Sequence, residues 1–375
     1  MIYLDYSANT PVDARVLEQF CAVERRCIGN ANSHHQAGSA AKAEIDAATI
    51  KIASLLGVQP AEIIYTSGAS EANNFALKGL ARLSRHAGRH IISTPLEHSS
   101  VSGTLTALQE QGYEIDLLDV KQDGTVDLEH LKDLLRPDTI CVAVTLVDSE
   151  LGVVQPVQEI AAILKAYPHC HLHVDATQAV GKIPVSFEGV DTMSLTAHKF
   201  YGLNGIGLLV KRRNLALEPL IHGGESTTIY RSGTPTVALA SSLACALDLA
   251  VTDLPGRVDH VAKLNAELRA ALSTYPLVRI NSPDHAIPHV LNLSVRNVKG
   301  TVFQRELDAK GVCVSVKSAC SSDGLPSRAV FAVSRDRRNA LSSWRISLSH
   351  LTTEDEIKAF LQAFDVCCRE LTALH

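Results

Sequence analysis

The sequence lacks the features that mark several classes of protein. It contains no uninterrupted apolar run of about 18 residues, the length that spans a membrane, and its opening residues show no basic segment leading into an apolar run. Its nine cysteines include no CxxC pair, which argues against a disulfide framework or zinc-finger spacing. The net charge of −5 is spread without long runs of either sign. We therefore expect a cytoplasmic protein that binds neither membranes nor nucleic acid directly.

Short apolar runs alternate with longer helical stretches through much of the chain. With 375 residues, 46% of them hydrophobic, the chain can bury a large core over two or three packed units. Several of the apolar runs lack polar alternation, as expected for strands covered on both faces. The pattern predicts an α/β fold with a mostly parallel seven-stranded sheet between helices, its strands at 62–67, 90–94, 114–120, 140–147, 171–176, 192–198 and 206–212.

The alternation of short apolar runs with helical stretches ends in the second half of the chain. A long helical region over residues 237–275 is broken at 253–256, where Pro and Gly stand together. We expect a large domain over residues 14–255 and a smaller α+β C-terminal domain over 256–375. The first 13 residues are expected to pack with the smaller domain.

Polar residues follow the expected strands, at the edge where ligands bind to parallel sheets. Gly68, Ala69 and Ser70 lie between the first strand and a helix expected to begin near Glu71. Backbone N–H groups and a hydroxyl at a helix N-terminus suit a phosphate, although a simple Ser cap is an alternative. His98 follows the next strand, and a lone histidine there is more often structural.

Two later strands are followed by residues with more specific chemistry. Asp175 and Gln178 follow the strand at 171–176; a buried Asp needs a cationic partner, such as a protonated ring nitrogen, unless it caps a helix. Lys199 follows the strand at 192–198, where desolvation would lower the pKa of its amine and favour Schiff-base formation. Thr196 and His198 precede Lys199 on the same side of it and could complete an anion site.

These parts are what pyridoxal 5'-phosphate requires of a protein: a phosphate cradle, a carboxylate for the pyridinium and a lysine amine. The chain resembles the fold type I, pyridoxal-phosphate-dependent transferases of the class V aminotransferase family, and within it the cysteine desulfurases. The resemblance covers nearly the whole chain. Its segments, in order, are LDYSANTPVD at 4, NANSHHQAG at 30, SGASEANN at 67, EHSS at 97, VDATQAVGK at 174, TAHKFYGLNGIG at 196, RSGT at 231, SVKSACSS at 315 and WRISLSHLTTEDEI at 344.

The resemblance implies a role for each matching residue at the cofactor. Lys199 would bind it covalently and move the substrate's α-proton, while Asp175 would hold the ring nitrogen. His98 would stack on the ring face as a catalytic residue, and Gln178 would reach the phenolic oxygen. The implied phosphate ligands are Gly68, Ala69, Ser70, Thr196 and His198, joined by Thr234 of a neighbouring subunit, so the resemblance also implies a homodimer.

The resemblance likewise implies the substrate contacts and the nucleophile. Arg345 would pair with the substrate carboxylate, as a bidentate guanidinium can, and His35 matches a position near the active site. Cys320, in the small polar segment KSACSSDG, would attack the sulfur of L-cysteine, giving L-alanine and a persulfide for transfer to an acceptor protein. A core cysteine is the alternative, but the flanking serines and Asp-Gly make it a poor core residue.

The sequence also departs from the resemblance and leaves alternatives open. HGGESTTIYRSGT lacks the usual Glu-Arg pair before RSGT, Asp148 and Ser149 stand where two asparagines are usual, and Lys317 replaces a common glycine. A selenocysteine lyase, an aminotransferase of the same family and a weakly active sulfur-system scaffold remain possible. A thiol protease is a poorer alternative, because it would give Lys199 no role. The destination of the sulfur, whether iron-sulfur clusters, RNA or DNA, is not determined, and no metal site is expected.

Overall fold

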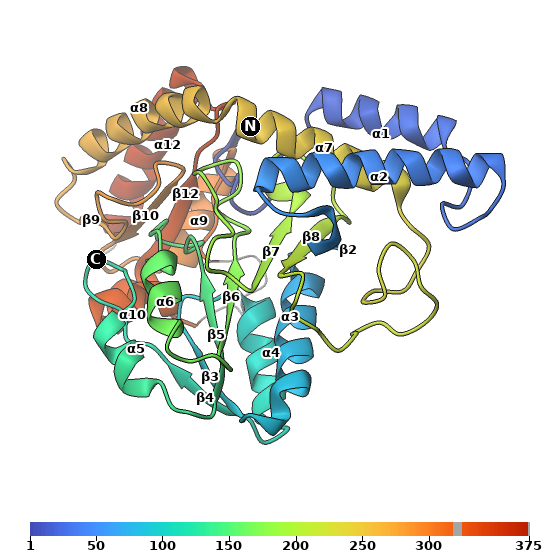
Figure 1. Cartoon of the computed structure of the whole chain (residues 1–375). Coiled ribbons are helices and arrows are strands. Elements are labelled where there is room, and N and C mark those ends of the chain that lie inside the picture. The colour runs from blue at the N-terminus through green and yellow to red at the C-terminus, as the bar shows by residue number, and fades with distance from the viewer. Residues whose placement is uncertain (318–324, 374–375) are drawn as a thin grey trace.

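The computed structural model describes residues 1–317 and 325–373 and has a mixed seven-stranded sheet at its centre (Figure 1). The strand order is β2-β8-β7-β6-β5-β3-β4. All neighbours are parallel except β8, which is antiparallel to both β2 and β7. The bounds are β2 Ile63–Thr66, β3 His90–Ser93, β4 Glu114–Leu117, β5 Thr139–Thr145, β6 His171–Asp175, β7 Thr192–Thr196 and β8 Gly207–Lys211. The predicted α/β fold with a mostly parallel seven-stranded sheet is confirmed.

Helices cover both faces of this sheet, which explains why its inner strands read as continuous apolar runs. Every residue of β5, β7 and β8 is buried, whereas β4 at the edge is largely exposed. Alternate residues of β5 enter different cores: Val142 and Val144 pack on one face, Cys141 and Ala143 on the other. The covering helices are α1 Ala14–Arg26, α2 Gln36–Leu56, α6 Val157–Leu164 and α7 Val237–Thr252 on the first face and α3 Ala69–Leu83 and α4 Ser99–Gln109 on the second.

A second core surrounds a three-stranded antiparallel sheet of order β12-β10-β9. Four aromatic side chains fill it, and the rings of Phe303 and Trp344 are stacked 5.1 Å apart. The elements of this region are α8 Leu254–Leu272, β9 Val278–Ile280, β10 Val290–Val295, α9 Gly300–Ala309, β11 Val312–Cys313, α10 Arg328–Ser334, α11 Arg337–Ser342, β12 Ser343–Ser347 and α12 Glu354–Thr372. Thr353 and Glu356 form a capping box at the start of α12.

The N-terminal strand β1 (Ile2–Tyr3) pairs in parallel with β11, and Leu4 is buried in the second core. The chain then runs from there to the central sheet, where Thr10 Oγ1 donates to His198 O at 2.9 Å. The first ten residues therefore bridge the two cores. The division into domains at residue 255 stays a prediction.

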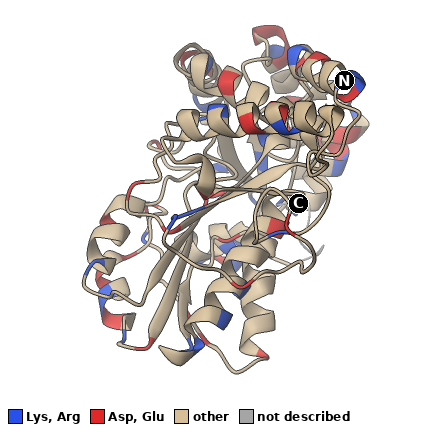
Figure 2. Ribbon diagram, turned by 45° about the vertical axis from the view of Figure 1, so that its right-hand side comes forward, with Lys and Arg blue, Asp and Glu red and all other residues tan. Residues whose placement is uncertain are grey.

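The long helical region breaks at Asp253, within the expected interval. Pro255 stands in the first turn of α8, where its missing N–H costs no intrahelical bond. Among the described residues, no single helix is both long and apolar enough to cross a membrane. Only α7 and α8 taken together, with a bend of 64° between them, reach that length and hydrophobicity. Residues of both charge signs are interspersed over the helices, and the strands of the large sheet carry few of them (Figure 2).

The remaining elements are short connections at the rim of the sheet. They are the helix α5 Leu128–Leu134 and the 3-10 helices η1 Pro60–Glu62, η2 Ser84–His86 and η3 Ala197–Lys199. Of these, η3 matters most, because it follows β7 directly and carries the lysine expected to bind the cofactor.

Candidate active site

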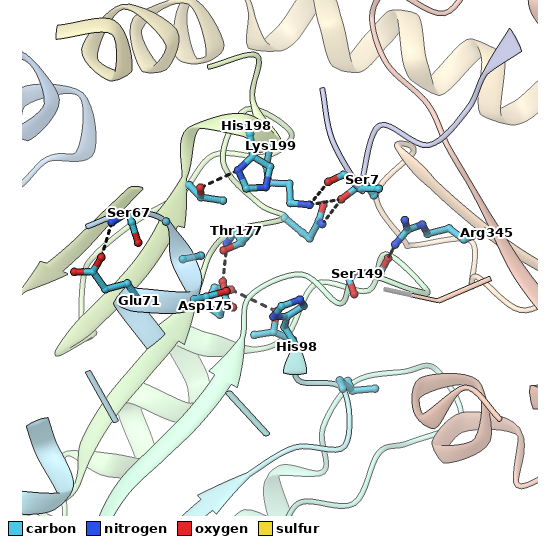
Figure 3. A pocket seen from close by; sticks show the side chains of 18 residues that line it. Ser7, Ser67, Glu71, His98, Ser149, Asp175, Thr177, His198, Lys199 and Arg345 are labelled. Atoms are coloured by element: carbon cyan, nitrogen blue, oxygen red, sulfur yellow. Dashed lines mark hydrogen bonds between the residues drawn. The ribbon is translucent and has the colours of Figure 1, made fainter. Parts of the chain in front are cut away.

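A cavity of about 330 Å³ lies at the ends of β5, β6 and β7 (Figure 3). These are the carboxyl ends of parallel strands, where ligands of such sheets bind. The cavity brings together most of the residues nominated from the sequence. Its lining includes Gly68, Ala69, Ser70, His98, Asp175, Gln178, Thr196, His198, Lys199 and Arg345.

One end of the cavity is the N-terminus of α3. The helix begins at Ala69, two residues before the expected start, because Gly68 serves as N-cap with a φ of 154° that L residues rarely adopt. No side chain caps this terminus, so its N–H groups face the cavity as a ready anion site. Across from it, Thr196 Oγ1 and His198 Nδ1 are 3.1 Å apart. Burial and the charge of Lys199 lower the pKa of His198 to about 4, so the ring is neutral at pH 7.

A second glycine, Gly207 in the GLNGIG segment, lets β8 pass close to this anion site. A Cβ on Gly207 would lie 2.6 Å from the Gly68 Cα and 2.6 Å from the Leu195 carbonyl oxygen. Both contacts are with backbone atoms, which cannot turn away as a flexible side chain can. Any larger residue at 207 would therefore displace the Gly68 turn.

Lys199 reaches into the cavity from η3 and is held by the N-terminal segment. Its Nζ donates to Ser7 O at 2.8 Å and to Ala8 O at 2.5 Å. Figure 3 shows this amine pointing toward Ser7. Thr10 secures the same segment, since the Tyr201 N–H donates to its Oγ1 at 2.8 Å. The carbonyls of residues 7 and 8, which the sequence did not nominate, thus orient the lysine.

Asp175 ends β6 with its carboxylate at the floor of the cavity. Oδ1 accepts from Thr177 N at 3.0 Å, and Oδ2 accepts from Asn73 Nδ2 at 2.8 Å. Asn73 Nδ2 also donates to Ser100 Oγ at 2.9 Å, and Ser100 Oγ lies 2.9 Å from His98 Nδ1. One continuous set of hydrogen bonds therefore joins the carboxylate to the imidazole. Burial lowers the pKa of His98 below its usual value.

The oxygen of the Asn73 amide is bound equally firmly. It accepts from Ser194 Oγ at 2.5 Å and lies 3.0 Å from His173 Nε2. His173 Nδ1 in turn lies 2.9 Å from Thr192 Oγ1, and burial lowers the pKa of this histidine. His173 is therefore part of the hydrogen-bonded support beneath Asp175.

Gln178 and Arg345 border the cavity on the side of the N-terminal segment. Gln178 Nε2 donates to Ser7 O at 2.9 Å. The Arg345 side chain is almost fully buried: Nη1 donates to Ser149 O at 2.7 Å and Nη2 pairs with Asp5 Oδ1 at 3.0 Å. Ser315 Oγ donates to the other oxygen of Asp5 at 2.7 Å. Asp5 therefore fixes the guanidinium that faces the cavity.

Two nominated residues lie away from this cavity. Thr234 is exposed, and His35 is exposed at the start of α2, where its Nδ1 accepts from Gly38 N at 3.1 Å. Neither lines the cavity of its own chain, so their proposed contacts stay predictions. Cys320 lies outside the described residues.

The DSELG segment meets the cavity with one residue only. Ser149 lines the cavity, whereas the buried Asp148 accepts from the N–H groups of Glu150 and Leu151 at 3.2 and 2.5 Å. Burial raises the pKa of Asp148 to about 7. Asp148 thus forms the turn that presents Ser149, rather than lining the cavity itself.

Sequence reasoning missed Asp5, Ser7, Asn73 and Lys182. All four stand inside segments that carried the family resemblance, LDYSANTPVD, SGASEANN and VDATQAVGK. Their positions in these segments were therefore a signal, but their roles required knowing which distant groups they contact.

Comparison with known proteins agrees with this site. The model of the family described as Aminotransferase class-V matches residues 2–360. Cysteine desulfurase IscS of Proteus mirabilis is 40% identical over 365 residues, covering 95% of this chain and 90% of the relative. A solved NifS-like protein superposes with a TM-score of 0.92 at 35% identity, over 100% of both chains. SspA in complex with cysteine gives a TM-score of 0.82 at 30% identity, over 94% of this chain and 100% of that one. The chain belongs to the class V aminotransferase family, whose members depend on pyridoxal phosphate.

Proposed function

We propose that the chain is an L-cysteine desulfurase, a sulfurtransferase that uses pyridoxal 5'-phosphate to convert L-cysteine to L-alanine. The observation that carries this proposal is the meeting of Lys199, Asp175 and the open N-terminus of α3 in one cavity. Relatives of 35 to 40% identity named cysteine desulfurase support the choice of substrate. The sulfur leaves as a persulfide on Cys320 and passes to an acceptor protein.

The residues of the cavity fit the cofactor. Its volume of about 330 Å³ lies within the range of small-molecule sites, roughly 300 to 1,000 Å³. The N–H groups beyond Gly68, with Ser70, Thr196 and His198, would hold the phosphate. Asp175 would hold the ring nitrogen, Gln178 the phenolic oxygen, and Lys199 the aldehyde carbon. When bound, the cofactor supplies an electron sink next to the substrate Cα.

The protein's own residues divide the remaining work. Arg345 binds the substrate carboxylate with the guanidinium that Asp5 and the carbonyl of Ser149 hold at the cavity. Lys199 Nζ takes the proton from the substrate Cα, and the carbonyls of Ser7 and Ala8 set the position of this amine. His98 lines the cavity; burial lowers its pKa, so its ring is neutral at pH 7 and can exchange a proton there.

Cys320 performs the sulfur transfer. Its thiolate attacks the substrate sulfur, an S–S bond forms, and the Cβ–S bond breaks with its electron pair remaining on carbon, which takes up a proton. Cysteine plus thiol thus become alanine plus persulfide, and atoms and electrons balance without an external oxidant. This role rests on the resemblance and on the named relatives.

The direct test is chemical trapping combined with product analysis. Borohydride reduction of the protein incubated with pyridoxal phosphate should leave an adduct on Lys199, located by peptide mapping. With L-cysteine and dithiothreitol, the protein should release alanine and sulfide. Cys320→Ala should retain the cofactor and lose alanine formation, whereas Lys199→Ala should lose both. The absence of an adduct on Lys199 would contradict the proposal.

The same assay separates the alternatives within the family. A selenocysteine lyase would form alanine from selenocysteine without Cys320, and an aminotransferase would convert the cofactor to its amine form with an amino donor. A scaffold would bind pyridoxal phosphate but turn over no cysteine even with an acceptor protein present. Undiminished alanine formation from cysteine by Cys320→Ala would rule out the persulfide route.

A homodimer is part of the proposal. Thr234 lies on the surface and outside the cavity of its own chain. In a dimer of the expected kind it would reach the phosphate held by the neighbouring subunit. Arg231, at the start of the same RSGT segment, is anchored to Glu71 of α3 at 3.0 Å, so the segment starts beside the phosphate-binding helix.

A further inference from the structure

Lys182 is a buried lysine that the proposed mechanism does not use. Its side chain is 6% exposed and lies just beyond Gln178 in the segment that follows β6. Its Nζ donates to Gln178 Oε1 at 2.5 Å. Within residues 1–317 and 325–373, no carboxylate lies within ion-pair distance of it. An ammonium with one neutral partner costs free energy to bury, so a role in the site is a better explanation than stability.

The cationic groups near Lys182 make its burial still less favourable. Burial first, and then the charges of Lys199 and Arg345, lower its pKa well below the usual value. His289 also faces it, and burial together with Lys182 lowers the pKa of that imidazole to about 3. Asp5 pairs with Arg345 at 3.0 Å, whereas no ion pair joins Lys182 itself to an acidic group in the part of the chain that the structure describes.

The hydrogen bonds around Gln178 allow only one orientation of its amide. Lys182 Nζ donates to Gln178 Oε1, so Gln178 presents its oxygen to Lys182. The carbonyl of Ser7 can only accept, so Gln178 must present its NH2 group there. The Ser7 carbonyl requires this orientation, and the bond from Lys182 reinforces it. One hydrogen of the NH2 group is used on Ser7, and the other remains for the cavity that Gln178 lines.

We propose that Lys182 is a positioning residue that holds the Gln178 amide with its NH2 toward the cavity, making Gln178 a fixed donor to the phenolic oxygen of pyridoxal phosphate. The inference rests on the proposed function, because the acceptor belongs to the cofactor. Without Lys182, the amide oxygen loses its partner, and only the bond to Ser7 O restrains the amide. The NH2 group is then held less firmly, and its bond to the phenolic oxygen weakens.

The loss should change the spectrum of the bound cofactor. A donor at the phenolic oxygen withdraws negative charge that would otherwise favour a proton on the nitrogen joining Lys199 to the cofactor. Weakening the donor should therefore keep that nitrogen protonated to higher pH. The loss of one hydrogen bond corresponds to an upward shift of about 0.5 to 1 pH unit in the titration of that nitrogen. It also corresponds to an affinity for pyridoxal phosphate that is weaker by about three- to tenfold.

The experiment compares Lys182→Met with wild type and with Lys211→Met. Lys211 is a matched control: it is 1% exposed, its Nζ donates to two backbone carbonyls, and it does not line the cavity. Apo-protein is titrated with pyridoxal phosphate, and the visible band of the bound form is followed against pH. Lys182→Met should show the upward shift, while Lys211→Met should match wild type.

A double-variant cycle tests whether Lys182 acts through Gln178. Gln178→Leu should shift the band in the same direction, and Gln178→Leu with Lys182→Met should shift it no further than Gln178→Leu alone. Additive shifts would overturn the proposal, since they would mean a direct charge effect. Lys182→Arg, which keeps the donors, should retain the wild-type spectrum. If circular dichroism shows that Lys182→Met does not fold, Lys182→Ala, which also lacks a donor, serves instead and should give a shift of the same sign.

The outcomes separate this inference from the proposed function. A wild-type protein that takes up no pyridoxal phosphate would refute the proposed function. A wild type that takes it up normally, beside a Lys182→Met variant with the same spectrum at every pH, would refute only the role of Lys182.

Discussion

The side-chain amide of Asn73 donates a 2.8 Å hydrogen bond to Oδ2 of Asp175. Asn73 stands in the first turns of α3, the helix whose N-terminus forms the proposed phosphate site. The same rigid helix therefore positions both the anion site and the carboxylate proposed to hold the ring nitrogen. A cofactor bound between them would meet two contacts at a fixed separation.

Asn73→Ala should destabilise the apo-protein by about 2 to 4 kcal/mol, because it removes a fully buried amide and takes a hydrogen-bond partner from Asp175 Oδ2 and from Ser194 Oγ. Urea unfolding followed by circular dichroism measures this. Asn74→Ala is the control, since Asn74 donates only to Ser70 O within its own helix and is partly exposed; it should cost less than about 1 kcal/mol. Equal losses in the two variants would contradict the supporting role of Asn73.

Asp5→Asn should raise the KM for L-cysteine about tenfold and change kcat much less. The carboxylate holds Arg345 Nη2 at 3.0 Å, so its loss frees a guanidinium proposed to bind the substrate carboxylate before any bond breaks. Steady-state alanine formation gives both constants. Asp46→Asn breaks an exposed pair with Lys42 and should leave the KM unchanged. A fall in kcat alone would place Asp5 elsewhere in the mechanism.

Glu97 should make the protein less stable as the pH rises. Burial raises the pKa of this carboxyl to about 8, and its Oε2 has no hydrogen-bond partner among the described residues. The unfolded chain loses this proton at lower pH than the folded one. Stability from Glu97 is therefore complete below about pH 4.5 and is lost progressively up to about pH 8.

Glu97→Gln should remove that dependence, since its amide oxygen can accept the bonds from Thr94 and Thr145 that Glu97 Oε1 accepts now. Urea midpoints at pH 5 and pH 9 provide the measurement. From pH 5 to pH 9, the free energy of unfolding of the variant should rise relative to that of wild type by several kcal/mol, at about 1.4 kcal/mol per pKa unit. The control Glu110→Gln, at an exposed position, should show the same pH dependence of stability as wild type. If Glu97→Gln also showed the wild-type pH dependence, the prediction for Glu97 would be contradicted.

The homodimer should appear in solution as a species of about twice 40.3 kDa by light scattering. Thr234→Val should weaken pyridoxal phosphate binding roughly three- to tenfold, the value of about one hydrogen bond, because it removes a hydroxyl proposed to reach the neighbouring subunit's phosphate. Thr236→Val is the matched control, since Thr236 is also exposed and its side chain does not cap α7. A monomer that binds the cofactor with wild-type affinity would exclude this contribution.

The strands and their order along the chain were predictable because strands buried on both faces appear in the sequence as continuous apolar runs. All seven expected runs contain a strand, and the largest differences lie at strand ends: the run at 114–120 forms a strand only over Glu114–Leu117. The antiparallel direction of β8 was not predicted. It depends on pairing with β2 and β7, which no local pattern records.

By itself the sequence determined the elements and the cavity residues that follow strands, such as Asp175 and Lys199, because a strand and the residues after it are adjacent in the chain. Only the tertiary structure decided which groups hold them. Asn73 meets Asp175 across 102 positions and Asp5 meets Arg345 across 340. Such contacts arise when separate cores pack and the N-terminal segment bridges them, so their distances are set by the packing of whole elements and not by any short stretch of residues.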